Sequence, residues 1–445
     1  MGNAKDTQRS WEVLTKQQHI AVLGQKYPER SFTALAHHID LEWLREAYRQ
    51  TRKEAAVGVD GQTGAEYGQD LEGNLKDLLQ RFKSGQYKAP PVRRVQIPKG
   101  KGETRPIGVP TFEDKVLQRA VVMLLEPLYE QDFLDCSYGF RPDRSAHEAL
   151  EEIWQRLMRQ GGGWVLEVDI RKYFDTLGWK QLREILDRRV RDGVIRRQIN
   201  QWLKAGVWEK GEWHSRSRGT PQGGVISPLL SNIYLHAVLD EWFEEEVRKR
   251  LEGAGYLVRF ADDFVMIFEF ERDARRVMEV LGKRLERYGL TIHAEKTRLV
   301  ELRPPRGKNP GGRPRGGTFD FLGFTHYWGK SRKGAWVVQR KTSKSRLSRS
   351  LGRIHQWCRQ HRHRPVRWQH QKLSQKVQGH YAYYGITGNG RSLQAFLEGV
   401  KKSWYKWLQR RSRNRRLDWE RYNQLLQHYR LPPVRVVHSV YAAKP

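Results

Sequence analysis

The chain has 445 residues, of which 38% are hydrophobic and 11% aromatic, so it can build folded domains with sizeable cores. Its 82 Lys and Arg against 50 Asp and Glu give a formal net charge of +32, which indicates a polyanion as partner. No window approaches a membrane span and the N-terminus lacks the apolar core of a signal peptide, so we expect a cytoplasmic protein without membrane attachment. Its only cysteines, Cys136 and Cys358, exclude a disulfide framework and a zinc site of paired thiolates.

Strand and helix signals alternate along the first part of the chain. A strand is predicted over 92–100, a buried helix over 112–130, and a strand running into a turn over 161–177. Helical patterns follow over 179–190 and 227–247. Two β-prone runs, 256–260 and 264–268, are then separated by only three residues, which predicts a hairpin with a tight turn.

The positive charge is concentrated after this part. Residues 330–445 hold 28 Lys and Arg against three acids and so carry +25 of the +32, which leaves +7 for the first 329 residues. The stretch RPPRGKNPGGRPRGG, 303–317, cannot bury a core and is expected to form a loop at the boundary. Trp and Tyr alternate with Arg and Lys in the tail, which suits structured RNA with unpaired bases, although about half of these Trp residues are expected in the core.

Two adjacent aspartates, Asp262 and Asp263, interrupt the apolar run LVRFADDFVMIF, and a third, Asp169, ends the apolar strand VLEVDI. A hairpin turn can carry two carboxylates at its exposed tip while the flanking apolar residues anchor the strands. Mg²⁺ prefers oxygen ligands, and two such ions about 4 Å apart can activate an attacking hydroxyl and stabilise a phosphate leaving group. We therefore expect Asp169 and Asp262 to bridge two ions, with Asp263 nearby; the alternative is an ordinary polar turn.

Further blocks give these motifs a family context. Their order resembles the palm of reverse transcriptases, and the flanking text is similar, more narrowly, to bacterial group II intron-encoded reverse transcriptase/maturases that lack the endonuclease domain. The resemblance runs from about residue 50 to roughly residue 390. The matching blocks are AAVGVDG (55–61), RRVQIPKGKGETRPIGVPTFEDKVLQRA (93–120), SYGFRPDRSAHEAL (137–150), VLEVDIRKYFDTL (165–177), GTPQGGVISPLLSNIYLHAVLDEW (219–242), RFADDFVMIF (259–268), LTIHAEKTRLV (290–300), FDFLGF (319–324) and GHYAYYGITGN (379–389).

The resemblance implies an α+β right-hand polymerase fold with fingers and palm, followed by a basic α-helical thumb/maturase domain. The expected division is an N-terminal extension over 1–75, fingers over 76–160, a palm with inserted fingers elements over 161–329, and an RNA-binding thumb/maturase domain over 330–445. This sequence departs from the family's YADD turn because Phe260 replaces the tyrosine, which keeps the packing of the ring but removes a hydroxyl. No Cys- or His-rich endonuclease segment is present among the 445 residues, so second-strand cutting is not expected of this polypeptide.

The function implied is an RNA-directed DNA polymerase encoded by a group II intron, which also binds the intron RNA as a splicing cofactor and supports retrohoming. The expected partners are structured intron RNA, an RNA template with a DNA primer, and dNTPs. The expected cofactor is a pair of Mg²⁺ ions, with Mn²⁺ as a substitute. Two alternatives stay open: a domesticated enzyme in repair or phage defence, and an RNA-binding maturase alone.

Metal ligands expected from the resemblance are Asp169, Ile170, Asp262 and Asp263. Lys296, in HAEKT, is implied as the donor of a proton to departing pyrophosphate, and an ordinary surface lysine is the alternative.

Substrate contacts are expected at three further places. Lys99 and Arg105 flank a Gly-containing turn and could both reach one triphosphate, joined by Arg93; a solvated hairpin tip is the alternative. Phe174 is implied to pack under the incoming sugar and exclude a 2′-hydroxyl, unless it is a plain core residue. Gln222, in GTPQGG, can hydrogen-bond to the templating pair, while the simpler reading is a helix entry with Ser227 as N-cap.

Overall fold

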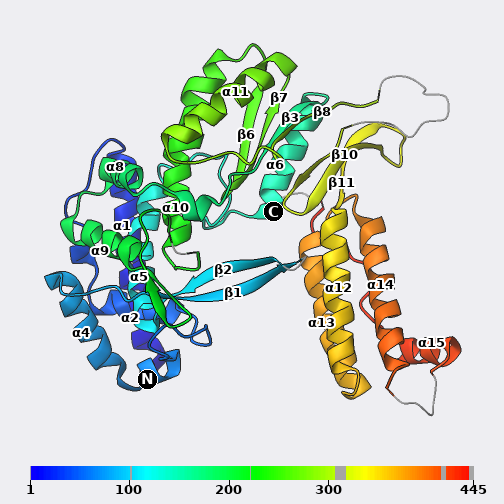
Figure 1. The fold of residues 1–445 in the computed structure, drawn as a ribbon, viewed down its shortest axis with the longest axis horizontal. Helices are drawn as coiled ribbons and strands as arrows, with labels where there is room; N and C mark the ends of the chain where they lie inside the picture. Colours follow the sequence, from blue (N-terminus) through cyan, green and yellow to red (C-terminus); the bar gives the residue numbers. More distant parts are fainter. Residues whose placement is uncertain (1, 101–102, 221, 306–316, 412–416, 440–445) are drawn as a thin grey trace. The chain divides into compact units, whose positions relative to one another are not determined.

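The computed structural model describes residues 2–100, 103–220, 222–305, 317–411 and 417–439 (Figure 1). The chain folds as two compact units. Unit 1 consists of Met1–Ser145, Val168–Phe264 and Arg275–Arg298, and unit 2 of Ala146–Glu167, Val265–Ala274 and Leu299–Pro445.

Helix α5, Phe112–Tyr129, is the central helix of unit 1 and packs against α1, Gly2–Lys26, and α2, Leu41–Gln50. Its apolar residues occupy most of the helix circumference, so it is buried along nearly its whole length. The other helices and helical turns of this unit are η1 Ala36–His38, α3 Gly64–Tyr67, η2 Gly68–Asp70, α4 Leu71–Ser84, α7 Tyr173–Thr176, α8 Trp179–Arg189, α9 Gly193–Lys204, α10 Ser227–Leu235, the π-helical turns η3 His236–Asp240 and η4 Phe243–Val247, and η5 Arg248–Arg250.

Strands β1, Val92–Gly100, and β2, Glu103–Val109, form a long hairpin (Figure 1). They belong to a four-stranded sheet of unit 1 with the order β2-β1-β4-β5. β1 and β2 are antiparallel, with Arg93 opposite Val109. β4, Val207–Glu209, runs parallel to β1 and forms a short antiparallel hairpin with β5, Glu212–His214.

The aspartate-bearing segments belong to another four-stranded sheet, with the order β6-β7-β3-β8. Its strands are β3 Gly163–Val168, β6 Gly255–Phe260, β7 Asp263–Phe268 and β8 Arg298–Leu302, and helix α11, Glu271–Arg287, follows β7 in the chain. β6 and β7 are buried along most of their length, because their apolar residues are almost continuous.

Unit 2 contains a three-stranded antiparallel sheet and a helical bundle. The sheet has the order β11-β10-β9, from β9 Phe319–Phe321, β10 Phe324–Lys330 and β11 Trp336–Thr342. The bundle helices α12, Lys344–His361, α13, Val366–Tyr384, and α14, Gly390–Leu408, lie side by side (Figure 1). Their shared core includes the fully buried Trp404, and unit 2 also contains the helices α6, Ala146–Arg159, and α15, Trp419–His428.

The structure confirms the mixed helices and strands and most of the predicted elements. β1 has the predicted bounds, and α5 ends one residue short of them. The expected N-cap at Ser227 is wrong: Ser227 is already the first residue of α10, and Ile226 precedes it without a side-chain cap. Of the predicted 303–317 loop, residues 306–316 lie outside the described part. No helix in the described part of the chain is long and apolar enough to cross a membrane.

Candidate active site

The aspartate pair stands on a tight turn between β6 and β7. Ala261, between the two strands, adopts a left-handed φ of 57° and is buried, while Asp262 beside it is half-buried. Such a φ is uncommon for a residue other than glycine, so the surrounding structure must hold the turn in place.

A neighbouring segment, 136–140, supports the turn from the side. Ser137 and Arg259 form a parallel bridge, the amide of Tyr138 donates to the Arg259 carbonyl at 2.9 Å, and the Arg259 amide donates to the Cys136 carbonyl at 2.8 Å. At Gly139 the two backbones approach so closely that a Cβ atom would lie 2.4 Å from the amide nitrogen of Ala261. Only glycine fits there, because any side chain would displace the turn.

The side chain of Arg259 lies beneath the turn and is fully buried. Its Nε and Nη2 atoms donate to the two carboxylate oxygens of Asp240 at 2.7 and 2.5 Å, and Nη1 donates to the side-chain oxygen of Asn232 at 3.0 Å and to the carbonyl of Ala261 at 3.1 Å. Burial disfavours the charge of Arg259, but Asp240 outweighs it and the pKa of the guanidinium is raised. A charged group therefore holds the carbonyl of the strained turn residue.

Asp169 follows the end of β3 and is held by the 291–297 segment. Its carbonyl accepts from the amide of His293 at 2.8 Å, and its amide donates to Oγ1 of Thr297 at 3.4 Å. Its carboxylate Oδ2 accepts from Nζ of Lys296 at 2.9 Å in a partly exposed ion pair. The next residue, Ile170, is buried and forms an antiparallel bridge with Ile292. A metal ion at Asp169 would thus share or displace the contact with Lys296.

Asp169 lies close enough to Asp262 for its charge to act on the Asp262 carboxyl group. Burial raises the pKa of Asp262, and the charge of Asp169 raises it further, whereas the charges of Arg105 and Arg259 oppose the shift. The β1–β2 hairpin therefore brings Arg105 within electrostatic reach of the aspartate turn. The shared metal site expected at Asp169 and Asp262 stays a prediction.

The turn that carries Phe174 contacts the GTPQGG segment. The carbonyl of Phe174 accepts from the amide of Thr220 at 2.7 Å, and a Cβ at Gly219 would lie 2.7 Å from that carbonyl. Phe174 is half-buried, with its ring 5.3 Å from that of Tyr173. The carbonyl of Gln222 accepts from the amide of Gly108 in β2 at 2.6 Å. Phe174 and Gln222 are therefore held in one connected backbone framework with the hairpin.

The three basic residues predicted to contact the triphosphate are Arg93, Lys99 and Arg105, and the structure places the side chains of Arg93 and Arg105 in different surroundings. Arg105 is exposed on β2, whereas Arg93 is turned inward, where its Nε and Nη2 atoms donate to the carbonyl of Val57 at 3.0 and 2.7 Å. In this arrangement Arg93 holds the AAVGVDG segment. The side chain of Lys99 lies outside the described residues.

No three His, Cys, Asp or Glu side chains gather in metal-binding geometry within the part of the chain that the structure describes. Mg²⁺ is usually held by only one or two carboxylates, and waters and substrate phosphates complete its shell. Burial, and after it the nearby charge of Asp169, raises the pKa of Asp262, so a divalent cation beside these two carboxylates would be favoured because it stabilises their charged forms.

Sequence reasoning missed the residues that support the turn: Arg259, Asp240, Asn232 and Gly139. One signal was available, because Arg259 is a charged residue within a strand that is otherwise buried and must therefore have a partner. The identity of that partner depends on tertiary packing, and the sequence carries no local sign of it.

Several known proteins are similar to this chain in sequence. A family model described as reverse transcriptase (RNA-dependent DNA polymerase) matches residues 97–326. Protein YkfC of Escherichia coli K12 is 38% identical over 257 residues, which cover 51% of this chain and 68% of YkfC. Group II intron-encoded protein LtrA of Lactococcus lactis subsp. cremoris is 44% identical over 168 residues, 37% of this chain and 27% of LtrA. Nuclear intron maturase 2 of Arabidopsis thaliana is 24% identical over 177 residues, 31% of this chain and 24% of that relative.

Proposed function

Because the chain belongs to the reverse transcriptase (RNA-dependent DNA polymerase) family, we propose that it is an RNA-directed DNA polymerase encoded by a group II intron, with Asp169 and Asp262 at its catalytic centre. The observation that carries this proposal is that Asp169 and Arg105 both lie close enough to the half-buried carboxyl group of Asp262 to act on its charge. Members of this family depend in general on a divalent cation. The finer assignment proposed here is two Mg²⁺ ions held by Asp169, Asp262, Asp263 and the carbonyl of Ile170, with Mn²⁺ as a substitute.

When bound, the ions would supply Lewis-acid activation of the primer 3′-hydroxyl and neutralise charge on the leaving pyrophosphate. The residues of the chain have complementary tasks. Arg105, exposed and near Asp262, attracts the triphosphate and can hold two of its oxygens. We assign the ring of Phe174 to the incoming sugar and the side chain of Gln222 to the templating pair; the support is that backbone hydrogen bonds to Thr220 and to Gly108 of β2 hold the two residues. Lys296 keeps an ammonium group at Asp169, from which it could protonate the departing pyrophosphate.

Primer extension tests the catalytic assignment. Asp169→Ala and Asp262→Ala should each abolish Mg²⁺-dependent extension of a DNA primer on an RNA template and leave RNA affinity nearly unchanged. Asp135→Ala serves as a control, because the side chain of Asp135 is 93% exposed and forms a surface ion pair with Arg144. Extension at the wild-type rate by either variant would refute the assignment.

The second part of the proposal is that the chain binds its intron RNA as a splicing cofactor. Its support is the surface around Trp407 in the helical bundle. The guanidinium carbons of Arg410, Arg359 and Arg362 lie 5.4, 5.9 and 6.0 Å from the centre of the Trp407 ring. The indole nitrogen of Trp407 is buried and has no hydrogen-bond partner among the described residues. Three cations around one aromatic ring form a concentrated positive site that suits a phosphate group.

A second group of aromatic rings and cations lies on helices α12 and α13. The rings of Trp357 and Trp368 are stacked 5.8 Å apart, and Nζ of Lys376 and the guanidinium of Arg364 lie 5.5 and 5.8 Å from the respective ring centres. Aromatic rings interleaved with cations suit RNA with unpaired bases better than a uniform duplex. In this model the protein stabilises the folded RNA, and the RNA itself performs the splicing reaction.

Each of the two alternative functions predicts the loss of one of two activities, splicing or primer extension. A domesticated polymerase would extend primers but would not promote splicing of the transcript that flanks its gene, whereas a maturase without polymerase activity would do the reverse. Primer extension and splicing measured side by side with that transcript therefore separate the three functions. Wild-type activity in both assays is the expected result.

A further inference from the structure

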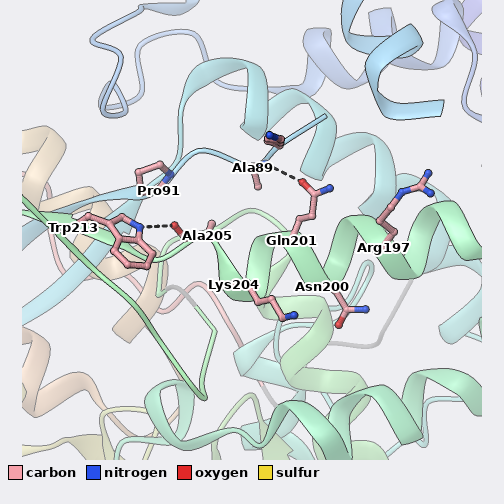
Figure 2. A pocket seen from close by; sticks show the side chains of 9 residues that line it. Ala89, Pro91, Arg197, Asn200, Gln201, Lys204, Ala205 and Trp213 are labelled. Carbon is pink, nitrogen blue, oxygen red and sulfur yellow. Dashed lines mark hydrogen bonds between the residues drawn. The ribbon is translucent and has the colours of Figure 1, made fainter. Parts of the chain in front are cut away.

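A hollow in unit 1 has none of the predicted active-site residues in its lining. It lies between the 88–91 segment, helix α9 and the β4–β5 hairpin, and its volume is about 730 Å³ (Figure 2). Its lining residues are Lys88, Ala89, Pro91, Arg197, Asn200, Gln201, Lys204, Ala205 and Trp213.

The lining is positive and polar. It contains three cations, Lys88, Arg197 and Lys204, and no acid. Arg197, Asn200 and Lys204 recur at helical spacing along α9, and Figure 2 shows Asn200 and Lys204 pointing the same way from the helix. The side-chain oxygen of Asn200 is buried without a hydrogen-bond partner among the described residues, whereas Gln201 accepts from the amide of Ala89 at 3.1 Å. The hollow thus offers positive charge together with an unused acceptor.

Trp213 presents an indole ring at the edge of the hollow. Its side chain is 54% exposed, and its ring N–H donates to the carbonyl of Ala205 at 3.2 Å, as Figure 2 shows. Gly206, with a φ of 76°, allows this position, because a Cβ there would lie 2.5 Å from the indole nitrogen. The ring is therefore fixed at one edge and open on a face.

A second exposed indole accompanies the first. Trp208 in β4 lies directly opposite Trp213 in β5, so both point to the same face of the hairpin, and Trp208 is 41% exposed. Lys210 and Gly211, with φ of 52° and 90°, form the tight turn that sets this register. Two large aromatic residues left in water on one face, beside a cluster of cations, indicate a binding surface.

We propose that this hollow binds an unpaired stretch of RNA, with bases stacked on Trp213 and Trp208 and phosphates at Lys88, Arg197 and Lys204. An apolar protein partner would leave three cations without acids, whereas a nucleic acid supplies phosphates for them. A duplex keeps its bases stacked on one another, so only unpaired bases can use the open indole faces. The identification of the nucleic acid as RNA rests on the proposed function.

Fluorescence anisotropy with a labelled 20-nucleotide unstructured RNA tests this proposal, with a fully paired RNA duplex of the same length as comparison. Trp213→Ala should weaken binding of the unpaired RNA about 5- to 150-fold and leave duplex binding unchanged. Trp213→Phe, which keeps a stacking ring, should recover most of the affinity. Lys88→Gln with Lys204→Gln should lower the slope of log K against log salt concentration by about 2. Phe270→Ala is the matched control, since this exposed aromatic residue lies outside the hollow.

Equal affinity of wild type and Trp213→Ala for the unpaired RNA would overturn the proposal, and so would equal losses for unpaired RNA and duplex. Trp213→Leu is a second variant in case Trp213→Ala unfolds, because it keeps apolar bulk at this position and removes the stacking ring; it should weaken unpaired RNA binding alone. The binding measurement does not depend on catalysis. A wild-type protein that failed to extend primers but bound RNA through Trp213 would refute the proposed function and leave this inference standing. An active polymerase whose RNA binding is unchanged by Trp213→Ala would refute this inference alone.

Discussion

Arg259 donates a hydrogen bond from Nη1 to the carbonyl oxygen of Ala261 at 3.1 Å, so a fully buried cation holds the residue that gives the aspartate turn its left-handed conformation. The cation is itself held by Asp240 through two hydrogen bonds. The geometry of Asp262 therefore depends on an ion pair that does not contact the substrate site.

We expect Arg259→Leu to destabilise the protein by about 3–5 kcal/mol, because it leaves the buried Asp240 carboxylate without its partner. Chemical denaturation monitored by circular dichroism measures this loss. The double variant Arg259→Leu with Asp240→Leu should recover most of the stability, since an apolar pair of similar volume replaces the charges.

The same double variant shows whether Arg259 positions the aspartate turn or only stabilises the fold. It removes the donor to the carbonyl of Ala261, so primer extension should stay about 10- to 100-fold below wild type even when the protein is folded. Full recovery of extension together with stability would show that Arg259 acts only on folding.

Asp262→Asn should abolish primer extension, by about 10³-fold or more if the metal site contributes several kcal/mol, and should raise the melting temperature in the absence of divalent ions. The reason for the second effect is that burial and Asp169 raise the pKa of Asp262, so its charge opposes folding at neutral pH. Differential scanning fluorimetry in EDTA measures the change. A lower melting temperature than wild type would contradict this electrostatic account, and the exposed Asp135→Asn should change neither quantity.

Local patterns predicted much of this site. The alternation around residues 256–268 predicts the hairpin because strand and turn signals are short-range, and the ends of β1 follow from its flanking residues in the same way. The block order predicts a shared metal site at Asp169 and Asp262, because the motifs carry the fold of their family, and this site stays a prediction. The four-part domain division stays a prediction.

Other features depend on contacts between distant parts of the chain. Arg93 is an example, because the family resemblance suggests a phosphate contact, while in the structure its guanidinium donates to the carbonyl of Val57, 36 residues away. Lys296 forms an ion pair with Asp169, which lies 127 residues earlier in the chain. A local sequence pattern cannot predict a pair between residues so far apart. The N-cap assigned to Ser227 failed for a related reason: a Ser-Pro pair suits a helix entry, but it does not determine which residue is the first in the helix.

Phe174→Val should relax discrimination against ribonucleotides by roughly 10- to 100-fold, because a smaller side chain leaves room for a 2′-hydroxyl. The backbone contact between Phe174 and Thr220 does not involve the ring, so the turn should persist in the variant. Single-nucleotide incorporation with dNTPs and rNTPs measures the ratio. Equal discrimination in both proteins would mean that Phe174 serves only to pack beside Tyr173.

The free energy of unfolding should change between pH 4 and pH 6 because Asp114 changes its protonation there. This carboxylate is fully buried at the start of α5, where it accepts from Trp202, Gln118 and Tyr87 at 2.6, 2.8 and 3.0 Å. Burial raises its pKa to about 6, although the three hydrogen bonds oppose the shift. Because the folded state holds the proton more tightly than the unfolded chain, the contribution of this group is complete below about pH 4 and is lost as the pH rises through about 6.

Asp114→Asn should remove this pH dependence, which is on the order of 3 kcal/mol. Urea unfolding of wild type and variant at pH 4, 5, 6 and 7 measures the difference between them. A difference that stayed constant over this range would show that Asp114 does not change protonation there.

Replacing Arg359, Arg362 and Arg410 with Gln should weaken binding of structured RNA and lower the slope of log K against log salt concentration by about 3, because each arginine that contacts a phosphate contributes about 1. The control is the replacement of Arg248, Lys249 and Arg250 with Gln, which removes the same charge from a segment whose two arginines pair with Glu244 and Glu246. Filter binding of a stem-loop RNA between about 50 and 200 mM salt covers the range where the slope is measurable. If both triple variants lost the same affinity, net charge alone would account for RNA binding, and the arrangement of cations around Trp407 would have no special part in it.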